Sequence, residues 1–256
     1  MKTVYLDLDN TLIYSWKHDI GQDKRMVELY QGREISFMTE KTWCLLQEVR
    51  QEYTVIPTTT RTKEQYDRID LGGGSFPLAL VCNGGHLLTD GHIDRSWYEA
   101  SKKLIAVSEG ELQKGIRYLE TAKERYFEIR FPDELFVFTK CHQPEQVIGR
   151  LEQILDPASV NVFANGEKVY IVPCSLDKGS AVKRLQERLG AEEILAAGDS
   201  LFDLSMVCAA DCGIVPAGFR ERYGCTGKDT VTEMPQGILF SEALLEYILK
   251  RGRKGR

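Results

Sequence analysis

Short apolar segments alternate with helical segments along most of this chain, and this alternation constrains the fold more than any other feature of the sequence. Chains with such a rhythm form a parallel sheet whose strands are connected by helices. Strands are expected at 3–8, 53–57, 78–82, 194–197 and 213–215, and helices at 40–51, 63–71, 179–189, 203–210 and 235–249. We therefore predict an α/β fold with a Rossmann-like, doubly wound parallel-sheet core.

The pattern changes between residues 86 and 172. Helices are expected at 98–125, with an interruption near Ser108, and at 144–155, and strands at 126–129, 135–138, 160–163 and 168–171. Strands in which apolar and polar residues alternate are typical of antiparallel sheets with one buried face. We predict an inserted α+β domain at 86–172, between the two parts of a core domain at 1–85 and 173–256.

Three local patterns in the N-terminal part add detail to the predicted core. The segments 28–30 and 34–37 flank Gln31-Gly32 and predict a hairpin. Thr39 is expected to cap the helix at 40–51, because a threonine hydroxyl can accept a hydrogen bond from the first turn. The three glycines 72–74 lack the GxxxxGK[ST] pattern of a phosphate loop and predict a plain connection.

Charge and composition narrow the classes of function. The chain has 256 residues and a formal net charge of -5, which gives no general attraction to nucleic acid or to an anionic membrane. No apolar stretch approaches the roughly 20 residues that span a bilayer, and the N-terminus lacks the pattern of a cleavable signal, so a cytoplasmic protein is expected. Seven scattered cysteines without a CxxC pair predict reduced thiols and no zinc site.

The basic tail 250–256 leaves one alternative open. It could contact nucleic acid, although such a terminus is more often a solvated end. Because the rest of the chain is acidic, we expect neither a nucleic-acid nor a membrane partner. The sequence does not indicate the oligomeric state.

Polar clusters follow four of the apolar segments directly. They are Asp7 with Asp9, Thr59, Asn83, and Asp199 with Asp203, while Lys178 opens a predicted helix. In an open parallel sheet the active crevice lies beyond the carboxyl ends of the strands, so these distant segments can converge. The sequence therefore predicts one site at that edge of the sheet.

The four acids predict a bound divalent cation. Asp7 and Asp9 lie on the same face if the strand continues, or are splayed if it ends in a turn, and Asp199 and Asp203 lie one helical turn apart. Four converging carboxylates without a cation would raise each other's pKa and destabilise the fold. Since all the ligands are oxygens and phosphate is the expected co-ligand, Mg²⁺ is the natural choice.

Each of these elements also has an ordinary structural explanation. A DxD pair after a strand is often a turn or a helix cap, Thr59 can be a strand-end hydroxyl, and a single lysine is usually solvated. A cation such as Lys178 in the first turn of a helix nevertheless opposes the helix dipole unless an anion compensates it. The joint occurrence of these residues, in order and at strand ends, favours a functional site.

The ordered motifs resemble those of the haloacid dehalogenase superfamily. The resemblance rests on Asp7-Leu8-Asp9-Asn10-Thr11-Leu12, Thr59, Lys178 and Gly198-Asp199-Ser200-Leu201-Phe202-Asp203. The large insert looks like the cap of Cof-type sugar phosphatases, a group that includes sucrose-phosphate and trehalose-phosphate phosphatases. Thr59-Thr60-Arg61 and Asn83-Gly84-Gly85 look like the T-G-R and N-G-[AG] signatures of that group, although Thr60 replaces its glycine and Asn10 stands where glycine is usual.

This resemblance implies a magnesium-dependent phosphatase that acts on a small phosphorylated metabolite, such as a sugar phosphate or a nucleoside-like phosphate. Asp7 would be the nucleophile and Asp9 the acid and base. Magnesium would be bound by Asp7, Asp9 through its main-chain carbonyl, and Asp199, with Asp203 orienting Lys178 or the metal. Thr59 and Lys178 would hold the phosphoryl oxygens, and Thr60, Arg61, Asn83 and Gly84 would contact the substrate. For Arg61 and Asn83, a helix-surface role and a turn role remain open.

Three other activities compete with hydrolysis. A phosphomutase or phosphotransferase of the same superfamily would differ only in the acceptor. A receiver-type signalling domain also gathers acids, a threonine and a lysine around magnesium, but the first-strand DxD and the length of the chain argue against it. A dehalogenase would not need Asp9.

Overall fold

The computed structural model describes residues 2–225 and 229–254. Contacts within the chain group its residues into two compact units, which are described separately below. The core unit consists of Met1–Asp94 and Lys178–Arg256, and the insert unit is Arg95–Asp177. The division expected from the sequence, with an inserted cap at 86–172, stays a prediction.

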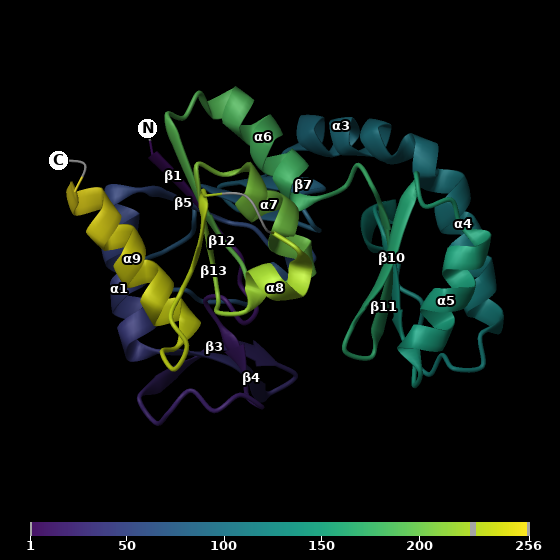
Figure 1. Ribbon diagram of the computed structural model, residues 1–256, viewed down its shortest axis with the longest axis horizontal. Coiled ribbons are helices and arrows are strands. Elements are labelled where there is room, and N and C mark those ends of the chain that lie inside the picture. Colours follow the sequence, from purple (N-terminus) through teal and green to yellow (C-terminus); the bar gives the residue numbers. More distant parts are fainter. Residues whose placement is uncertain (1, 226–228, 255–256) are drawn as a thin grey trace. The chain divides into compact units, whose positions relative to one another are not determined.

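A five-stranded parallel sheet forms the centre of the core unit. Its strand order is β14 (Val231–Glu233), β13 (Cys212–Val215), β12 (Glu193–Ala197), β1 (Lys2–Leu6) and β5 (Thr54–Pro57). All four pairings are parallel, and β1 lies between β12 and β5. The sheet thus continues on one side of β1 with β12, β13 and β14, and on the other side with β5 (Figure 1). The predicted doubly wound parallel core is confirmed.

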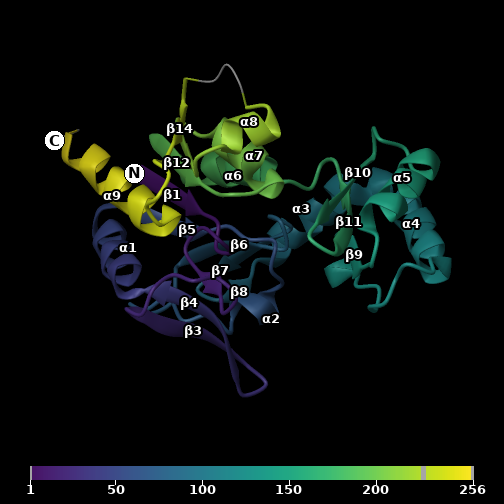
Figure 2. The same ribbon diagram turned by 60° about the horizontal axis from the view of Figure 1, so that its bottom comes forward.

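Helices cover both faces of this sheet. On one face α1 (Glu40–Glu52) packs against α9 (Phe240–Lys254), and on the other α6 (Lys178–Leu189) packs against α7 (Leu204–Ala209) (Figures 1 and 2). Val4 and Leu6 of β1 join the hydrophobic cluster under α1 and α9, whereas the intervening Tyr5 does not, as expected for side chains that alternate along a strand. The Thr39 hydroxyl accepts a hydrogen bond from the Thr42 N–H at 3.0 Å, so the predicted cap of α1 is confirmed.

Two small antiparallel sheets complete the core unit. One consists of β2 (Tyr14–Ser15), β4 (Arg33–Thr39) and β3 (Lys24–Tyr30), which contains the predicted hairpin, and the other of β6 (Leu78–Val81), β7 (His86–Thr89) and β8 (His92–Ile93). The strand expected at 78–82 is therefore not a member of the parallel sheet. It pairs locally with β7 and is joined to the segment after β5 by a bridge between Thr58 and Leu80.

Two predicted helices of the core unit differ from the structure. The helix expected at 63–71 ends after one turn, as α2 (Lys63–Tyr66), because Ile69 bridges to Glu28 of β3. The helix expected at 235–249 begins only at Phe240, since Gly237 has a φ of 85° that no right-handed helix accommodates. The helix α8 (Phe219–Tyr223) was not predicted.

The insert unit has an α+β architecture, as predicted. Helices α3 (Arg95–Ile105) and α4 (Glu109–Thr121) are separated by a 3₁₀ turn at Ala106–Ser108, where an interruption was expected. An antiparallel sheet in the order β10 (Val160–Asn165), β11 (Lys168–Pro173) and β9 (Val137–Lys140) packs against α4 and α5 (Pro144–Ile154). The strand expected at 126–129 does not form. The Arg125 side chain instead donates hydrogen bonds to the carbonyls of Leu119 and Phe127. The segment pairs with β9 and the residue after it through two isolated bridges, Arg130 with Phe138 and Arg125 with Cys141.

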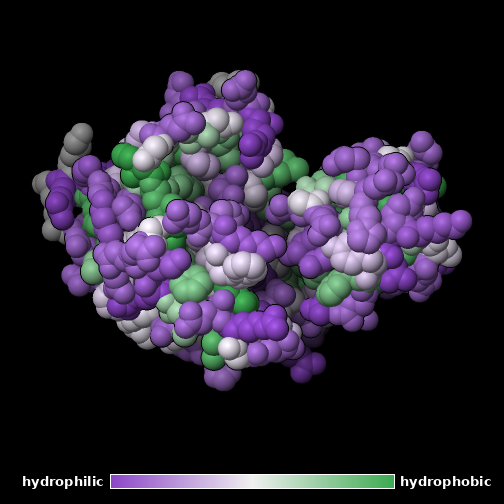
Figure 3. Space-filling model, turned by 90° about the horizontal axis from the view of Figure 1, so that it is seen from below, coloured by the Kyte–Doolittle hydropathy of each residue, from purple (hydrophilic) through white to green (hydrophobic). Residues whose placement is uncertain are grey.

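The face shown in Figure 3 is mainly hydrophilic, with separate small hydrophobic patches. Among the described helices, none has both the length and the apolar character that crossing a bilayer requires. The seven cysteines form no disulfide within the described ranges. Residues 250–254 of the basic tail continue α9, where Arg251 bonds Glu193 at 3.1 Å, and residues 255–256 lie outside the described part of the chain.

Candidate active site

Three of the four predicted acids lie together at the carboxyl end of the parallel sheet. Asp7 directly follows β1, and its N–H donates to the carbonyl of Ala197 at the end of β12 at 3.0 Å. Asp199 follows β12 closely, and Asp203 is the last residue of the 3₁₀ turn Leu201–Asp203 that comes next. Asp7, Asp199 and Asp203 each offer a carboxylate oxygen, and these atoms lie within 4.8 Å of one another.

Lys178 lies between two of these acids. It is the first residue of α6 and is only 1% exposed. Its Nζ donates to Oδ1 of Asp7 and to Oδ1 of Asp203, both at 2.5 Å. A cation in the first turn of a helix requires a compensating anion, and here two buried carboxylates supply it.

Asp203 holds the loop as well as the lysine. Its Oδ2 accepts hydrogen bonds from the N–H of Asp199 at 3.1 Å and from the N–H and hydroxyl of Ser200 at 2.9 and 2.8 Å. Gly198 is required beside it, because a Cβ there would lie 2.3 Å from the Asp203 Cβ. With both oxygens in hydrogen bonds and no exposed surface, Asp203 is suited to positioning its neighbours.

Burial and mutual repulsion perturb the ionisation of this cluster. Burial and the charge of Asp203 raise the pKa of Asp7 well above its usual value, although Lys178 lowers it. Burial and Asp203 raise the pKa of Asp199 to about 7. Burial lowers the pKa of Lys178, but Asp203 and Asp7 together raise it above its ordinary value. Lys178 is therefore a fixed cation, and the three carboxylates carry more negative charge than it balances.

These three carboxylates fit a hard divalent cation. Their donor atoms are all oxygens, and they lie close enough together for one ion to reach them. Burial and the neighbouring carboxylates raise the pKa of Asp7 and Asp199, and a bound cation would offset that repulsion between the carboxylates.

Asp9 does not join this cluster through its side chain. The strand β1 ends at Leu6, and a turn follows in which the N–H groups of Leu12 and Ile13 both donate to the Leu8 carbonyl at 2.9 Å. Asn10 adopts a φ of 58° in this turn, at the position where the resemblance expected glycine. Of the two arrangements left open by the sequence, the structure therefore has the splayed one, and Asp9 is about half exposed.

Arg61 binds Asp9 as a bidentate partner. Its Nε and Nη2 lie 2.7 Å from Oδ2 and Oδ1 of Asp9, and its Nη1 lies 2.8 Å from Oε2 of Glu28. The guanidinium thus bridges two carboxylates. A contact between Arg61 and the substrate stays a prediction.

Thr59 and Thr60 follow β5, near the strand ends that carry the acids. Thr59 is fully buried, its N–H donates to the Leu80 carbonyl at 2.8 Å, and its hydroxyl accepts from the Arg61 N–H at 3.1 Å. Thr60 is partly exposed. The backbone of this segment is thereby fixed against β6.

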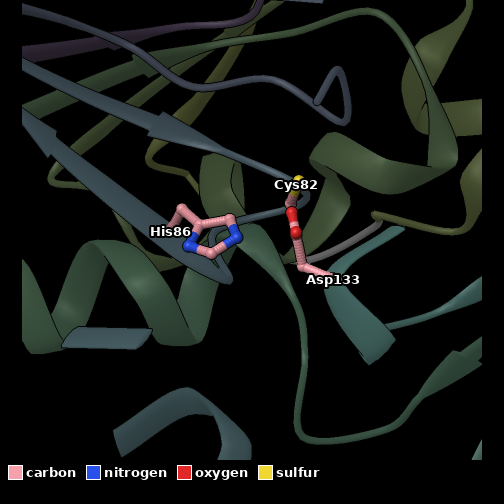
Figure 4. Close-up of side chains that lie close together, drawn as sticks. All are labelled: Cys82, His86 and Asp133. Atoms are coloured by element: carbon pink, nitrogen blue, oxygen red, sulfur yellow. The ribbon is translucent and has the colours of Figure 1, made fainter. Parts of the chain in front are cut away.

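Asn83 and Gly84 form the turn between β6 and β7, which Figure 4 shows between the labelled Cys82 and His86. Cys82, Asn83 and Gly84 have φ values of 51°, 58° and 86°, so the turn has a left-handed backbone. The Asn83 N–H donates to the Thr59 carbonyl at 3.0 Å. The turn role left open for Asn83 is thus present, and a substrate contact by Asn83 or Gly84 stays a prediction.

Sequence reasoning missed Glu28, Ser36 and Arg68. Glu28 lies in β3 with its side chain fully buried, and it accepts hydrogen bonds from Ser36, Arg61 and Arg68. The pairing of β3 with β4 shifts its register on both sides of Glu28, so the alternation of buried and exposed residues along the strand does not mark this glutamate as buried. An apolar residue on either side, Val27 and Leu29, was the only available signal.

By sequence, parts of the chain are similar to known phosphatases. The family model for sucrose-6F-phosphate phosphohydrolase matches residues 120–224. A phosphoglycolate phosphatase from Pyrobaculum aerophilum is 34% identical over 110 residues, which are 42% of this chain and 46% of that protein. One from Archaeoglobus fulgidus is 30% identical over 126 residues, which are 47% and 55% of the two chains. The matched region spans about half the length of these curated relatives.

Solved structures resemble the chain over nearly its whole length. The sucrose-phosphatase from Synechocystis sp., in complex with sucrose and phosphate, has a TM-score of 0.67 at 17% identity and covers 97% of this chain and 96% of its own. A haloacid dehalogenase-like hydrolase from B. subtilis has a TM-score of 0.58 at 16% identity, with 97% and 99% covered. At such identities the likeness shows the fold.

Proposed function

We propose that the chain is a member of the haloacid dehalogenase superfamily and acts as a magnesium-dependent phosphatase that hydrolyses a small phosphorylated metabolite. The observation that carries this proposal is the buried arrangement of Lys178 between Asp7 and Asp203, with Asp199 beside them. Lys178 holds Oδ1 of Asp7, which leaves Oδ2 as the attacking atom. A carboxylate that attacks phosphorus divides hydrolysis into two easier displacements.

In the first displacement, Oδ2 of Asp7 forms a bond to phosphorus while the bond from phosphorus to the leaving oxygen breaks. Asp9 gives a proton to that oxygen. In the second, water attacks the aspartyl-phosphate, Asp9 takes the proton of the water, and inorganic phosphate leaves Asp7. Because Arg61 holds both oxygens of Asp9, at least one of these hydrogen bonds must lengthen for each proton transfer.

Lys178 and Thr59 would bind the remaining phosphoryl oxygens. Lys178 is a fixed cation next to the nucleophile, and Thr59 follows the strand beside β1. Donors fixed in place before the reaction stabilise developing charge without the reorganisation that water would require.

Magnesium would be held by Asp7, Asp199 and the main-chain carbonyl of Asp9, with Asp203 orienting the site. When bound, it neutralises charge on the phosphoryl oxygens. The proposal is supported by the oxygen-only donor set and by the raised pKa of Asp7 and Asp199, which a cation would lower.

The substrate would be a sugar phosphate or another small phosphomonoester. The names of the relatives, which act on sucrose phosphate and phosphoglycolate, indicate which compounds to test first. We also propose that the segment 86–172 acts as a cap that selects the substrate, together with contacts from Thr60, Arg61, Asn83 and Gly84. The acidic balance of the chain favours such a small molecule over nucleic acid, and we place its reaction in the cytoplasm.

The test is a screen of sugar phosphates, polyol phosphates, nucleotides and phosphoglycolate, with release of inorganic phosphate as the readout. Turnover should require Mg²⁺ and stop in excess chelator. Full turnover in chelator would contradict the metal assignment. Transfer of the phosphoryl group to a second sugar, without release of phosphate, would indicate a mutase instead.

A further inference from the structure

Glu28 is a charged residue whose side chain is completely buried in β3. Its Oε2 accepts from the Ser36 hydroxyl at 2.7 Å and from Nη1 of Arg61 at 2.8 Å, and its Oε1 accepts from Nε and Nη2 of Arg68 at 3.2 and 3.1 Å. A buried carboxylate is strongly unfavourable unless it is paired and hydrogen-bonded. Four hydrogen bonds from three side chains satisfy that condition.

Arg61 connects Glu28 to Asp9. The guanidinium is planar and rigid, so the Glu28 bond at Nη1 fixes the plane from which Nε and Nη2 reach the two oxygens of Asp9. The backbone of Arg61 is also held, because its N–H donates to the Thr59 hydroxyl and its carbonyl accepts from the Cys82 N–H at 2.7 Å. Arg61 therefore transmits the position of Glu28 to Asp9.

The charges in this chain of contacts are balanced. Glu28 and Asp9 contribute two negative charges, and Arg61 and Arg68 contribute two positive charges. Without the charge of Glu28, Arg61 would have Asp9 as its only anionic partner in the network. The plane of the Arg61 guanidinium, and with it the position of the Asp9 carboxylate, would then be less firmly fixed.

We propose that Glu28 is a positioning residue that acts through Arg61 to place Asp9 for proton transfer, without contacting the substrate. This inference rests on the proposed function, in which Asp9 is the acid and base. It assigns a role to the β3–β4 hairpin, which none of the predicted site residues occupies.

The test compares two leaving groups in the full-length protein with Mg²⁺. A sugar phosphate has an alkoxide leaving group that needs a proton, whereas p-nitrophenyl phosphate has an activated one that needs little acid help. Glu28→Gln should lower kcat/KM for the sugar phosphate by about 10- to 100-fold, which is less than the roughly 10²–10⁴-fold loss that complete removal of acid catalysis causes. For p-nitrophenyl phosphate, kcat/KM should change less than about threefold, because it reports the first displacement.

Two further variants make the result specific. Glu34→Gln changes an exposed glutamate of the same hairpin and should affect neither substrate. Ser36→Ala removes one of the four bonds to Glu28 and should shift the ratio of the two kcat/KM values in the same direction, but less. It serves in place of Glu28→Gln if that variant does not fold.

Equal losses on both substrates, or no loss on either, would overturn the role of Glu28 while the wild-type protein remains an active phosphatase. Absence of magnesium-dependent turnover of both substrates by the wild-type protein would instead overturn the proposed function, and the inference with it.

Discussion

Lys178 and Asp7 are 171 positions apart in the sequence, yet the Nζ of one lies 2.5 Å from Oδ1 of the other, and both residues are almost completely buried. The contact arises because α6 begins at the edge of the sheet where β1 ends. The lysine cannot leave this position without leaving two carboxylates, Asp7 and Asp203, unpaired inside the protein.

Replacement of this lysine should destabilise the protein in a pH-dependent way. In Lys178→Met, the metal-free protein should lose about 3 kcal/mol of unfolding free energy at about pH 8, as when one partner of a buried ion pair is removed. The folded-state pKa of Asp7 is already raised, so its contribution to stability is present at low pH and lost as the pH rises through the folded value. The loss should therefore be smaller at about pH 5.5.

Denaturant unfolding at the two pH values, in the presence of chelator, measures this difference. Lys183→Met changes an exposed lysine of the same helix and should have little effect at either pH. A loss in Lys178→Met that does not depend on pH would contradict the account.

Gly198 and Gly149 should respond to alanine in opposite directions. A Cβ at Gly198 would lie 2.3 Å from both Cβ and Cγ of Asp203, so Gly198→Ala should displace that carboxylate and cost about 2 kcal/mol, as overpacking does. Gly149 lies within α5 with nothing within 4 Å of an added Cβ, and Gly149→Ala should stabilise the protein by about 0.5–1 kcal/mol. Unfolding midpoints of both variants test this, and a Gly198→Ala protein as stable as the wild type would refute it.

The binding of magnesium should weaken as the pH falls. In the metal-free protein the pKa of Asp199 is raised to about 7, so below that pH the carboxyl is protonated and must lose its proton to bind the ion. The apparent affinity should fall by up to about tenfold per pH unit below about pH 7. Calorimetric titration with Mg²⁺ at about pH 6, 7 and 8 measures it.

Asp90→Asn removes an exposed carboxylate outside the cluster and should leave this pH dependence unchanged. An affinity that is constant over this range would show that Asp199 is ionised in the metal-free protein or is not a ligand.

The sequence was sufficient to predict features that depend on local patterns. Asp7 and Asp199 could be placed at one edge because each directly follows an apolar strand, and the carboxyl ends of parallel strands meet there. The cap of α1 by Thr39 is likewise a property of adjacent residues. Motif spacing was therefore enough to bring together residues nearly two hundred positions apart.

Features that depend on a distant partner could not be predicted in this way. Residues 67–71 have a helical pattern, but Ile69 pairs with Glu28, and β6 has the composition of a parallel strand but pairs with β7. The partner of Arg61 is similarly set by where β3 lies, not by any spacing between the two segments. Glu28 was missed for this reason.

The two acids of the first motif should have separable roles in turnover. Asp7→Asn should remove the nucleophile and nearly all activity, while Asp9→Asn should keep the attacking carboxylate and slow each displacement by about 10²–10⁴-fold. With an activated leaving group the first displacement needs little acid help, so Asp9→Asn should accumulate aspartyl-phosphate on Asp7. Intact-mass analysis after acid quench, followed by peptide mapping, should find one added phosphoryl group on the N-terminal peptide. Near-normal turnover by Asp7→Asn, or a label that maps to another residue, would show that the reaction does not pass through Asp7.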